Sequence, residues 1–197
     1  MFRKSSAVLS ALVLSLLLPV LTEAGVEKYA VDPGHSEVGF AVRHFVAKVA
    51  GRFDKFEGEI SIDPEDHTAF SFTGKIDASS INTNNEERDN HLRSPDFFGA
   101  KENPQITFRS KKVSRNRDTL KVTGDLTIRG VTQEVTLDVE VLGFGPDAWG
   151  GHRAGFEAHG KINRKAFGMQ WNKKLDQGGL VLGDDVELTL RIEAVRH

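Results

Sequence analysis

Apolar and polar residues alternate along most of the chain after residue 24, and the alternation is clearest near the C-terminus. Every even-numbered residue from Val186 to Ala194 is apolar, whereas the odd-numbered residues between them are charged or carry a hydroxyl group. A period of two predicts a β-strand with one buried face, because successive side chains of a strand point to opposite sides. We therefore expect the even-numbered side chains from Val186 to Ile192 to point into the protein.

Seven other segments show the same period, so the sequence predicts about eight strands. These segments are residues 38–42, 56–62, 70–78, 106–110, 120–128, 135–141 and 156–162. The connections between them are short and carry turn-forming residues, such as Asp-Pro-Gly at 32–34 and Gly-Pro-Asp at 145–147. Short connections join antiparallel neighbours, because parallel strands need a long crossover.

One segment, residues 84–93, interrupts the alternation and is predicted to be a short helix. It lacks β-branched residues, Asn84 and Glu87 have the spacing of a capping box, and Pro95 follows the segment. Its one large apolar residue is Leu92. A helix with so little apolar surface cannot fill a core, so we expect it to lie across one end of the sheet.

A two-sheet sandwich and a closed barrel would each bury one apolar face of every strand. The alternating segments reach roughly 10 residues, or about 30 Å, which favours a barrel over the shorter strands usual in a sandwich. The predicted fold class is therefore all-β, an extended antiparallel β-barrel of about eight strands with one short helix. Glycines at 58, 74, 124 and 160 fall on the apolar faces, where they either let the sheet bend within a filled core or leave empty volume.

Residues 1–24 do not follow the strand pattern. A short basic start and an almost wholly apolar run from Ala7 to Leu18 precede small residues that end at Ala24, an order typical of a secretory signal peptide. A membrane anchor, the alternative, needs roughly 20 unbroken apolar residues, and Pro19 interrupts this run. We divide the chain into a signal peptide and one domain, residues 25–197, and expect a periplasmic or secreted protein.

Composition narrows the classes of function. The chain has 197 residues, no cysteine and a formal charge of −2. The lack of cysteine excludes disulfides, thiolate nucleophiles, cysteine-type zinc sites and iron–sulfur clusters. The lack of a basic excess makes nucleic acid an unexpected partner. Phenylalanine supplies 13 of the aromatic residues, against one Tyr and two Trp, so the apolar faces carry rings without polar groups, which suits an oily, flexible ligand.

Six motifs resemble those of the YceI-like family, in the same order and over nearly all of the chain after residue 24. They are residues 32–40 (DPGHSEVGF), 49–53 (VAGRF), 88–98 (RDNHLRSPDFF), 104–110 (PQITFRS), 124–132 (GDLTIRGVT) and 163–169 (NRKAFGM). The resemblance implies a lipocalin-like barrel that binds a long polyisoprenoid or a related amphiphilic lipid, such as an isoprenoid quinone, in its lumen. It also implies transport or storage of that lipid in the periplasm, with no cofactor besides this non-covalent ligand.

The residues on the predicted inner faces are the candidates to contact a lipid in the lumen. They are Phe40, Val42, Phe56, Ile60, Phe72, Ile76, Phe108, Val122, Leu126, Leu137, Val139, Phe156, Leu188 and Leu190. Each of them taken singly is also compatible with an ordinary core position.

Charged residues of the predicted helix are candidates for the mouth of the lumen. Arg88 and His91 lie three residues apart and so share a face, from which Asp89 is expected to turn away. One interpretation places Arg88 or His91 against a polar or anionic lipid head group. The other, which we favour, has Arg88, Asp89 and His91 fix the helix to the barrel through buried hydrogen bonds. The same two interpretations stay open for four further cations at turns or strand ends, although a charge at such a place is usually solvated: Arg52, Arg129, Arg164 and Lys165.

The histidines give little indication of catalysis or of a metal. His35 and Ser36 are neighbours on an extended segment and would point to opposite sides, which prevents a nucleophile–base pair. No two histidines have the spacing that places metal ligands on one face of a helix or strand. We therefore expect neither a catalytic residue nor a metal site. Two other hypotheses stay open: an enzyme that modifies its lipid with His35 or His91 as general base, and a β-module that binds a protein.

The expected partner is thus an isoprenoid lipid. Contact with a membrane during lipid exchange and formation of a homodimer are left open, as are the head group and the chain length of the lipid.

Overall fold

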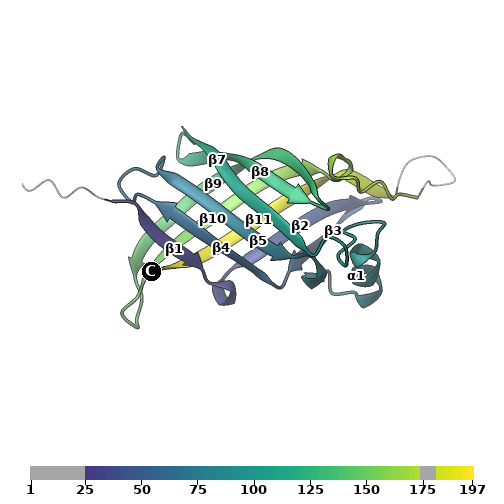
Figure 1. The fold of residues 1–197 in the computed structure, drawn as a ribbon, viewed down its shortest axis with the longest axis horizontal. Helices are drawn as coiled ribbons and strands as arrows, with labels where there is room; N and C mark the ends of the chain where they lie inside the picture. Colours follow the sequence, from purple (N-terminus) through teal and green to yellow (C-terminus); the bar gives the residue numbers. More distant parts are fainter. Residues whose placement is uncertain (1–24, 174–180) are drawn as a thin grey trace, which may run out of the picture.

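The computed structural model describes residues 25–173 and 181–197, which form one antiparallel sheet of eleven strands (Figure 1). The strands are β1 (Glu27–Val31), β2 (Glu37–His44), β3 (Ala47–Phe53), β4 (Phe56–Ile62), β5 (Phe70–Asp77), β6 (Ile81–Asn82), β7 (Gln105–Asn116), β8 (Thr119–Ile128), β9 (Val131–Pro146), β10 (His152–Asn163) and β11 (Leu182–Arg196). The predicted signal peptide, residues 1–24, lies outside the described residues. No helix within the described ranges is long and apolar enough to span a bilayer.

Eight of these strands close into a barrel, which confirms the predicted fold. The order is β1-β4-β5-β7-β8-β9-β10-β11, and β1 pairs with β11 to complete the circle, for example through Tyr29 opposite Arg196. Strands β10 and β11 share eleven consecutive residue pairs, from Arg153 with Val195 to Asn163 with Asp185. The even-numbered side chains of β11 between Val186 and Ile192 face the barrel interior, as the alternation predicts.

Three short strands extend the sheet at one end of the barrel. Strand β2 follows β1 after a single 3-10 turn, Pro33–His35, and continues along β11. Strand β3 pairs with β2 on one side and, on the other, only with the two residues of β6. The helix α1 (Glu86–Arg93) lies at this end (Figure 1), which confirms that it covers an end of the barrel.

The start of α1 differs from the prediction by one residue at its cap. Asn85, and not Asn84, is the N-cap, and its side chain accepts a hydrogen bond from the Arg88 N–H. Asn84 instead has a positive φ of 59°, a left-handed conformation that asparagine tolerates. Asp89 has only 6% of its surface exposed, so it is buried against the barrel, as the favoured anchoring interpretation requires.

The interior of the barrel is filled at the end where β1 closes the sheet. Tyr29, Ile62 and Val122 are almost fully buried there. The rings of Tyr29, Phe144 and Phe156 form a chain of aromatic contacts with centroid separations of 6.0 and 6.4 Å. The buried Tyr29 hydroxyl donates to the carboxylate of Glu27, and both burial and this hydrogen bond raise the pKa of Tyr29.

The inward-facing glycines make room for neighbouring side chains. A Cβ atom at Gly124 would lie 2.6 Å from the Phe108 ring, and one at Gly160 would lie 2.5 Å from Leu137. At Gly74 the Phe72 ring occupies the same place, 2.8 Å from such an atom. At these three positions a neighbouring side chain takes up the room, although Gly74 still borders open space inside the barrel.

Candidate functional site

The end of the barrel at which α1 lies contains a cavity of about 600 Å³. Ten of the fourteen predicted inner residues line it, and they come from seven strands: Phe40, Val42, Phe56, Phe72, Ile76, Phe108, Leu126, Leu137, Leu188 and Leu190. The volume lies within the range of small-molecule sites in proteins. The lining is overwhelmingly apolar, so the cavity suits a hydrocarbon ligand.

Four predicted inner residues do not line this cavity. Ile60, Val122, Val139 and Phe156 are each 5% exposed or less and pack at the filled end. Their side chains point inward as the alternation requires, but a period of two defines only the face of a strand. It carries no information about how far along the barrel axis a residue lies.

Segments outside the regular alternation complete the lining. Phe97 and Phe98 follow α1, Met169 and Trp171 follow β10, and Phe53 ends β3. The Phe97 ring lies 5.3 Å from that of Trp171, and the Phe98 ring lies 5.7 Å from that of Phe53. Of these, only the Phe-Phe pair beside the helix gave a signal in the sequence, since large apolar residues after a polar helix have to pack somewhere.

Helix α1 is fixed to the barrel through Thr83. The carboxylate of Asp89 accepts hydrogen bonds from the Thr83 N–H and from the Thr83 hydroxyl. The guanidinium of Arg88 donates to the Thr83 hydroxyl oxygen at 2.7 Å and to its carbonyl oxygen at 2.8 Å. The anchoring that the sequence favours for Arg88 is therefore present, and Arg88 also lines the cavity as an exposed side chain.

His91 occupies the next turn of the same helix and also lines the cavity. Its Nε2 lies 3.0 Å from a carboxylate oxygen of Asp96. Its ring stands edge-on to Phe97 and Trp171, with centroids 5.0 and 4.9 Å away. The imidazole is thus held between an acid and two aromatic rings at the rim of an apolar cavity.

Arg164 is not solvated, contrary to the expectation from the sequence. It is 2% exposed, and its guanidinium donates to the carbonyl oxygens of Met169, Trp171 and Gly183 at 2.7–2.8 Å. Burial lowers the pKa of this guanidinium, while Asp184 opposes that effect. Arg164 thereby holds the segment that carries Trp171 against the cavity. Arg129 likewise donates to the carbonyl oxygens of two residues that follow α1.

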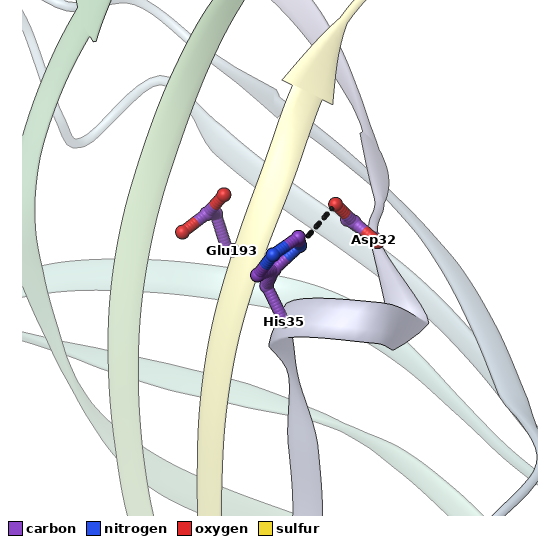
Figure 2. Close-up of side chains that lie close together, drawn as sticks. All are labelled: Asp32, His35 and Glu193. Atoms are coloured by element: carbon purple, nitrogen blue, oxygen red, sulfur yellow. Dashed lines mark hydrogen bonds and ion pairs between the residues drawn. The ribbon is translucent and has the colours of Figure 1, made fainter. Parts of the chain in front are cut away.

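Within the part of the chain that the structure describes, one group of three possible metal ligands comes together, outside the cavity: Asp32, His35 and Glu193 (Figure 2). His35 Nδ1 lies 2.8 Å from an Asp32 carboxylate oxygen. The guanidinium of Arg153 donates to both carboxylates. Hydrogen bonds from Arg153, which has the larger effect, and from His35 lower the pKa of Asp32 to about 2. A cation already neutralises this group, so the arrangement is that of an ion-pair network.

Ser36, the residue beside His35, is bound to the backbone of β11. Its hydroxyl donates to the Glu193 carbonyl oxygen at 3.1 Å and accepts from the Glu193 N–H at 3.0 Å. His35 itself has 61% of its side chain exposed and does not line the cavity. The two side chains therefore serve different contacts, and neither faces a cavity-bound ligand.

The comparison with protein families decides the class of this barrel. The model for the YceI-like domain matches residues 29–194. The chain belongs to the YceI-like family. The matched range begins on β1 and ends on β11, the two strands whose pairing closes the barrel.

Relatives in this family include UPF0312 proteins of staphylococci. One from Staphylococcus aureus is 42% identical over 167 residues, which cover 84% of this chain and 95% of that protein. One from Staphylococcus epidermidis is 40% identical over 168 residues, with 84% and 96% covered.

Solved structures share the YceI-like barrel. BcnA from Burkholderia cenocepacia superposes with a TM-score of 0.74 at 27% identity, covering 83% of this chain and 99% of BcnA. The Campylobacter jejuni YceI protein gives 0.68 at 33% identity, with 79% and 90% covered. A polyisoprenoid-binding domain from Saccharophagus degradans gives 0.63 at 17% identity, with 86% and 98% covered, and shows likeness of fold alone.

Proposed function

We propose that this YceI-like protein binds the long apolar chain of an isoprenoid lipid in the cavity and carries or stores it in the periplasm. The observation that carries the proposal is a cavity of about 600 Å³ whose walls are phenylalanine and aliphatic side chains from seven strands. Burying a hydrocarbon chain stabilises a complex by about 0.8 kcal/mol per methylene group. Such a lining can therefore bind a lipid tightly without polar contacts along its length.

Part of the polar lining comes from α1, whose Arg88 and His91 both border the cavity. The lipid chain would occupy the apolar interior, and a polar head group would lie beside Arg88 and His91. The Saccharophagus degradans domain that shares the fold is a polyisoprenoid-binding domain, which supports an isoprenoid as the class of ligand. The signal peptide predicted at residues 1–24 supports export to the periplasm.

An enzyme acting on the same lipid has less support. His35 lies outside the lining, and Ser36 is bound to the backbone of β11. His91 lines the cavity but stands among aromatic rings and Asp96, with no serine among the lining residues of that cavity for it to activate. We therefore propose a binding role without catalysis and without a resident metal.

Extraction of the purified protein with organic solvent, followed by mass spectrometry, tests the proposal. We expect a long-chain lipid at close to one molecule per protein. Delipidated protein should then melt at a higher temperature as isoprenoid is added, because the ligand binds only the folded state. A Leu188→Trp variant, which narrows the cavity, should reduce this shift, whereas Thr189→Trp on the opposite face of β11 should keep it. Absence of any thermal shift with isoprenoids of several lengths would refute the proposal.

A further inference from the structure

The turn between β2 and β3 exposes two apolar side chains. Phe45 and Val46 form a two-residue connection, since His44 before them pairs with Ala47 after them. Val46 is 94% exposed and Phe45 is 44% exposed. Among the described residues, no large apolar side chain is more exposed than Val46.

The sequence of this turn is unfavourable for a hairpin in water. Phe45 adopts a positive φ of 50°, in the left-handed region where glycine, asparagine and aspartate are preferred. A bulky aromatic residue there is strained. Residues that suit neither the backbone conformation nor the solvent indicate that the turn has a function besides connecting two strands.

The turn is continuous with the cavity described above. Val42 and His44 before it line the cavity, as does Val49 after it. The Phe45 N–H donates to the Val181 carbonyl oxygen at 2.9 Å, and Val181 lines the cavity too. The hairpin and α1 lie at the same end of the barrel (Figure 1). A surface that contacts this turn would therefore also face the cavity mouth.

The charges around the turn favour one kind of surface. Residues 43–48 contain two cations, Arg43 and Lys48, and no acidic residue. Both cations are exposed, as is Lys173 on the segment beside the turn, while Glu187 pairs with Lys48. Apolar side chains that project beside exposed cations match a bilayer with anionic head groups, because the apolar tip enters the acyl region and the cations stay at the surface.

We propose that the β2–β3 turn, Phe45 and Val46, inserts into an anionic lipid bilayer and docks the cavity mouth on it. The lipid chain then passes between bilayer and cavity without crossing water. This inference rests on the proposed lipid-binding function, but the contact with the bilayer can be measured separately from it.

The test replaces the turn by one that suits water. Of the two turn residues only Phe45 has a positive φ, which suits a hairpin turn with glycine at its first central position. The variant Phe45→Gly/Val46→Asn should therefore fold at least as well as the unmodified protein. Trp149→Ser is the matched control, because Trp149 is 83% exposed on the β9–β10 connection at the other end of the barrel. Each protein is expressed as the full chain and purified in the form that the cell produces.

Two readouts separate docking from lipid binding. The first is co-sedimentation with vesicles of phosphatidylethanolamine and phosphatidylglycerol, or of phosphatidylcholine alone. We expect the turn variant to bind the anionic vesicles at least tenfold more weakly than the unmodified protein does. Arg43→Gln/Lys48→Gln should lose affinity for the anionic vesicles but not for those of phosphatidylcholine. Trp149→Ser should bind both kinds of vesicle as the unmodified protein does. The second is isoprenoid uptake by delipidated protein, from anionic vesicles or from a soluble cyclodextrin complex. The turn variant should take up lipid at least tenfold more slowly from vesicles and at an unchanged rate from cyclodextrin.

Several results would overturn the docking proposal. Equal vesicle binding by the turn variant and the unmodified protein would do so, as would equal loss in Trp149→Ser. Slower uptake from cyclodextrin as well would assign Phe45 and Val46 to the cavity wall instead. Binding of a protein by the β2–β3 turn, without binding of any vesicle, would replace the proposed membrane contact by a protein docking site. Vesicle binding without isoprenoid uptake would leave the docking intact and refute the proposed function.

Discussion

Truncation of one leucine at each end of the barrel should have opposite consequences for stability and for binding. Leu120 on β8 is 3% exposed and packs at the filled end. Leu188 on β11 faces the cavity and lies opposite Phe40 and Gly160 in the sheet. The two substitutions, Leu120→Ala and Leu188→Ala, remove the same atoms, so any difference reflects only what surrounds them.

The expected magnitudes follow from the packing at the two sites. At Leu120 the truncation opens a new void, which costs about 3–4 kcal/mol of unfolding free energy. In a chain of this size that lowers the melting temperature by roughly 10 °C. At Leu188 the side chain already borders a void, so we expect a loss of about 1 kcal/mol for the apolar area alone. The same lost contact with a bound chain should weaken lipid affinity by about five- to tenfold.

Urea unfolding of delipidated protein, followed by circular dichroism, measures the first quantity, and titration with a fluorescent isoprenoid measures the second. Leu120→Ala should retain the affinity of the unmodified protein at temperatures where it is folded. The reasoning is refuted if Leu188→Ala destabilises the protein as much as Leu120→Ala does and binds lipid normally, because the cavity would then be collapsed in solution.

Three further predictions concern the framework around the cavity. Gly124→Ala should lower the free energy of unfolding by about 1–3 kcal/mol, because its Cβ would lie 2.4 Å from a backbone carbonyl oxygen of β7; Gly145→Ala, with nothing within 4 Å, should leave the melting temperature unchanged. Asp89→Ala should cost about 1–3 kcal/mol by leaving buried donors unsatisfied, and hydrogen exchange should show α1 opening before the barrel. Because the pKa of Asp32 falls from 3.8 to about 2 on folding, its contribution to stability is full above the unfolded value and is lost as pH falls through the folded one. Arg153→Met should therefore lose less of its melting temperature than the unmodified protein between about pH 5 and pH 2, and parallel losses would contradict this assignment.

The sequence predicts the inner face of each strand well and the position of the cavity poorly. Leu126 and Val122 lie on the same face of β8, yet Leu126 lines the cavity and Val122 packs at the filled end. Alternation is a local property, whereas filling depends on which strands meet at each end. Strand β1, which closes the filled end, is only five residues long and gave no clear period.

The polar framework is the part that sequence spacing could not show. Arg153 reaches Asp32, which is 121 positions away, and Arg164 reaches Gly183, which is 19 positions away. Both arginines look like ordinary strand-end charges in the sequence, because their partners are carboxylates and carbonyl oxygens that only the closed barrel brings near. The helix cap shows the same limit on a smaller scale, since Asn84 and Asn85 are equally able to cap and the chain path alone selects Asn85.

The two ends of the barrel differ in the kind of interaction that closes them, and this difference bears on how a lipid could enter. At the filled end, β1 is hydrogen-bonded to β4 and to β11, so separating those strands would break several backbone hydrogen bonds at once. At the cavity end, β3 has only the two residues of β6 beyond it, and α1 covers the end through the Thr83 contacts and the aromatic rings that follow the helix. Side-chain contacts of this kind open at a lower free-energy cost than a strand pair does. The α1 end is therefore where the proposed lipid would enter with the sheet intact, so we expect the stability of the barrel and the access to its cavity to depend on different sets of residues.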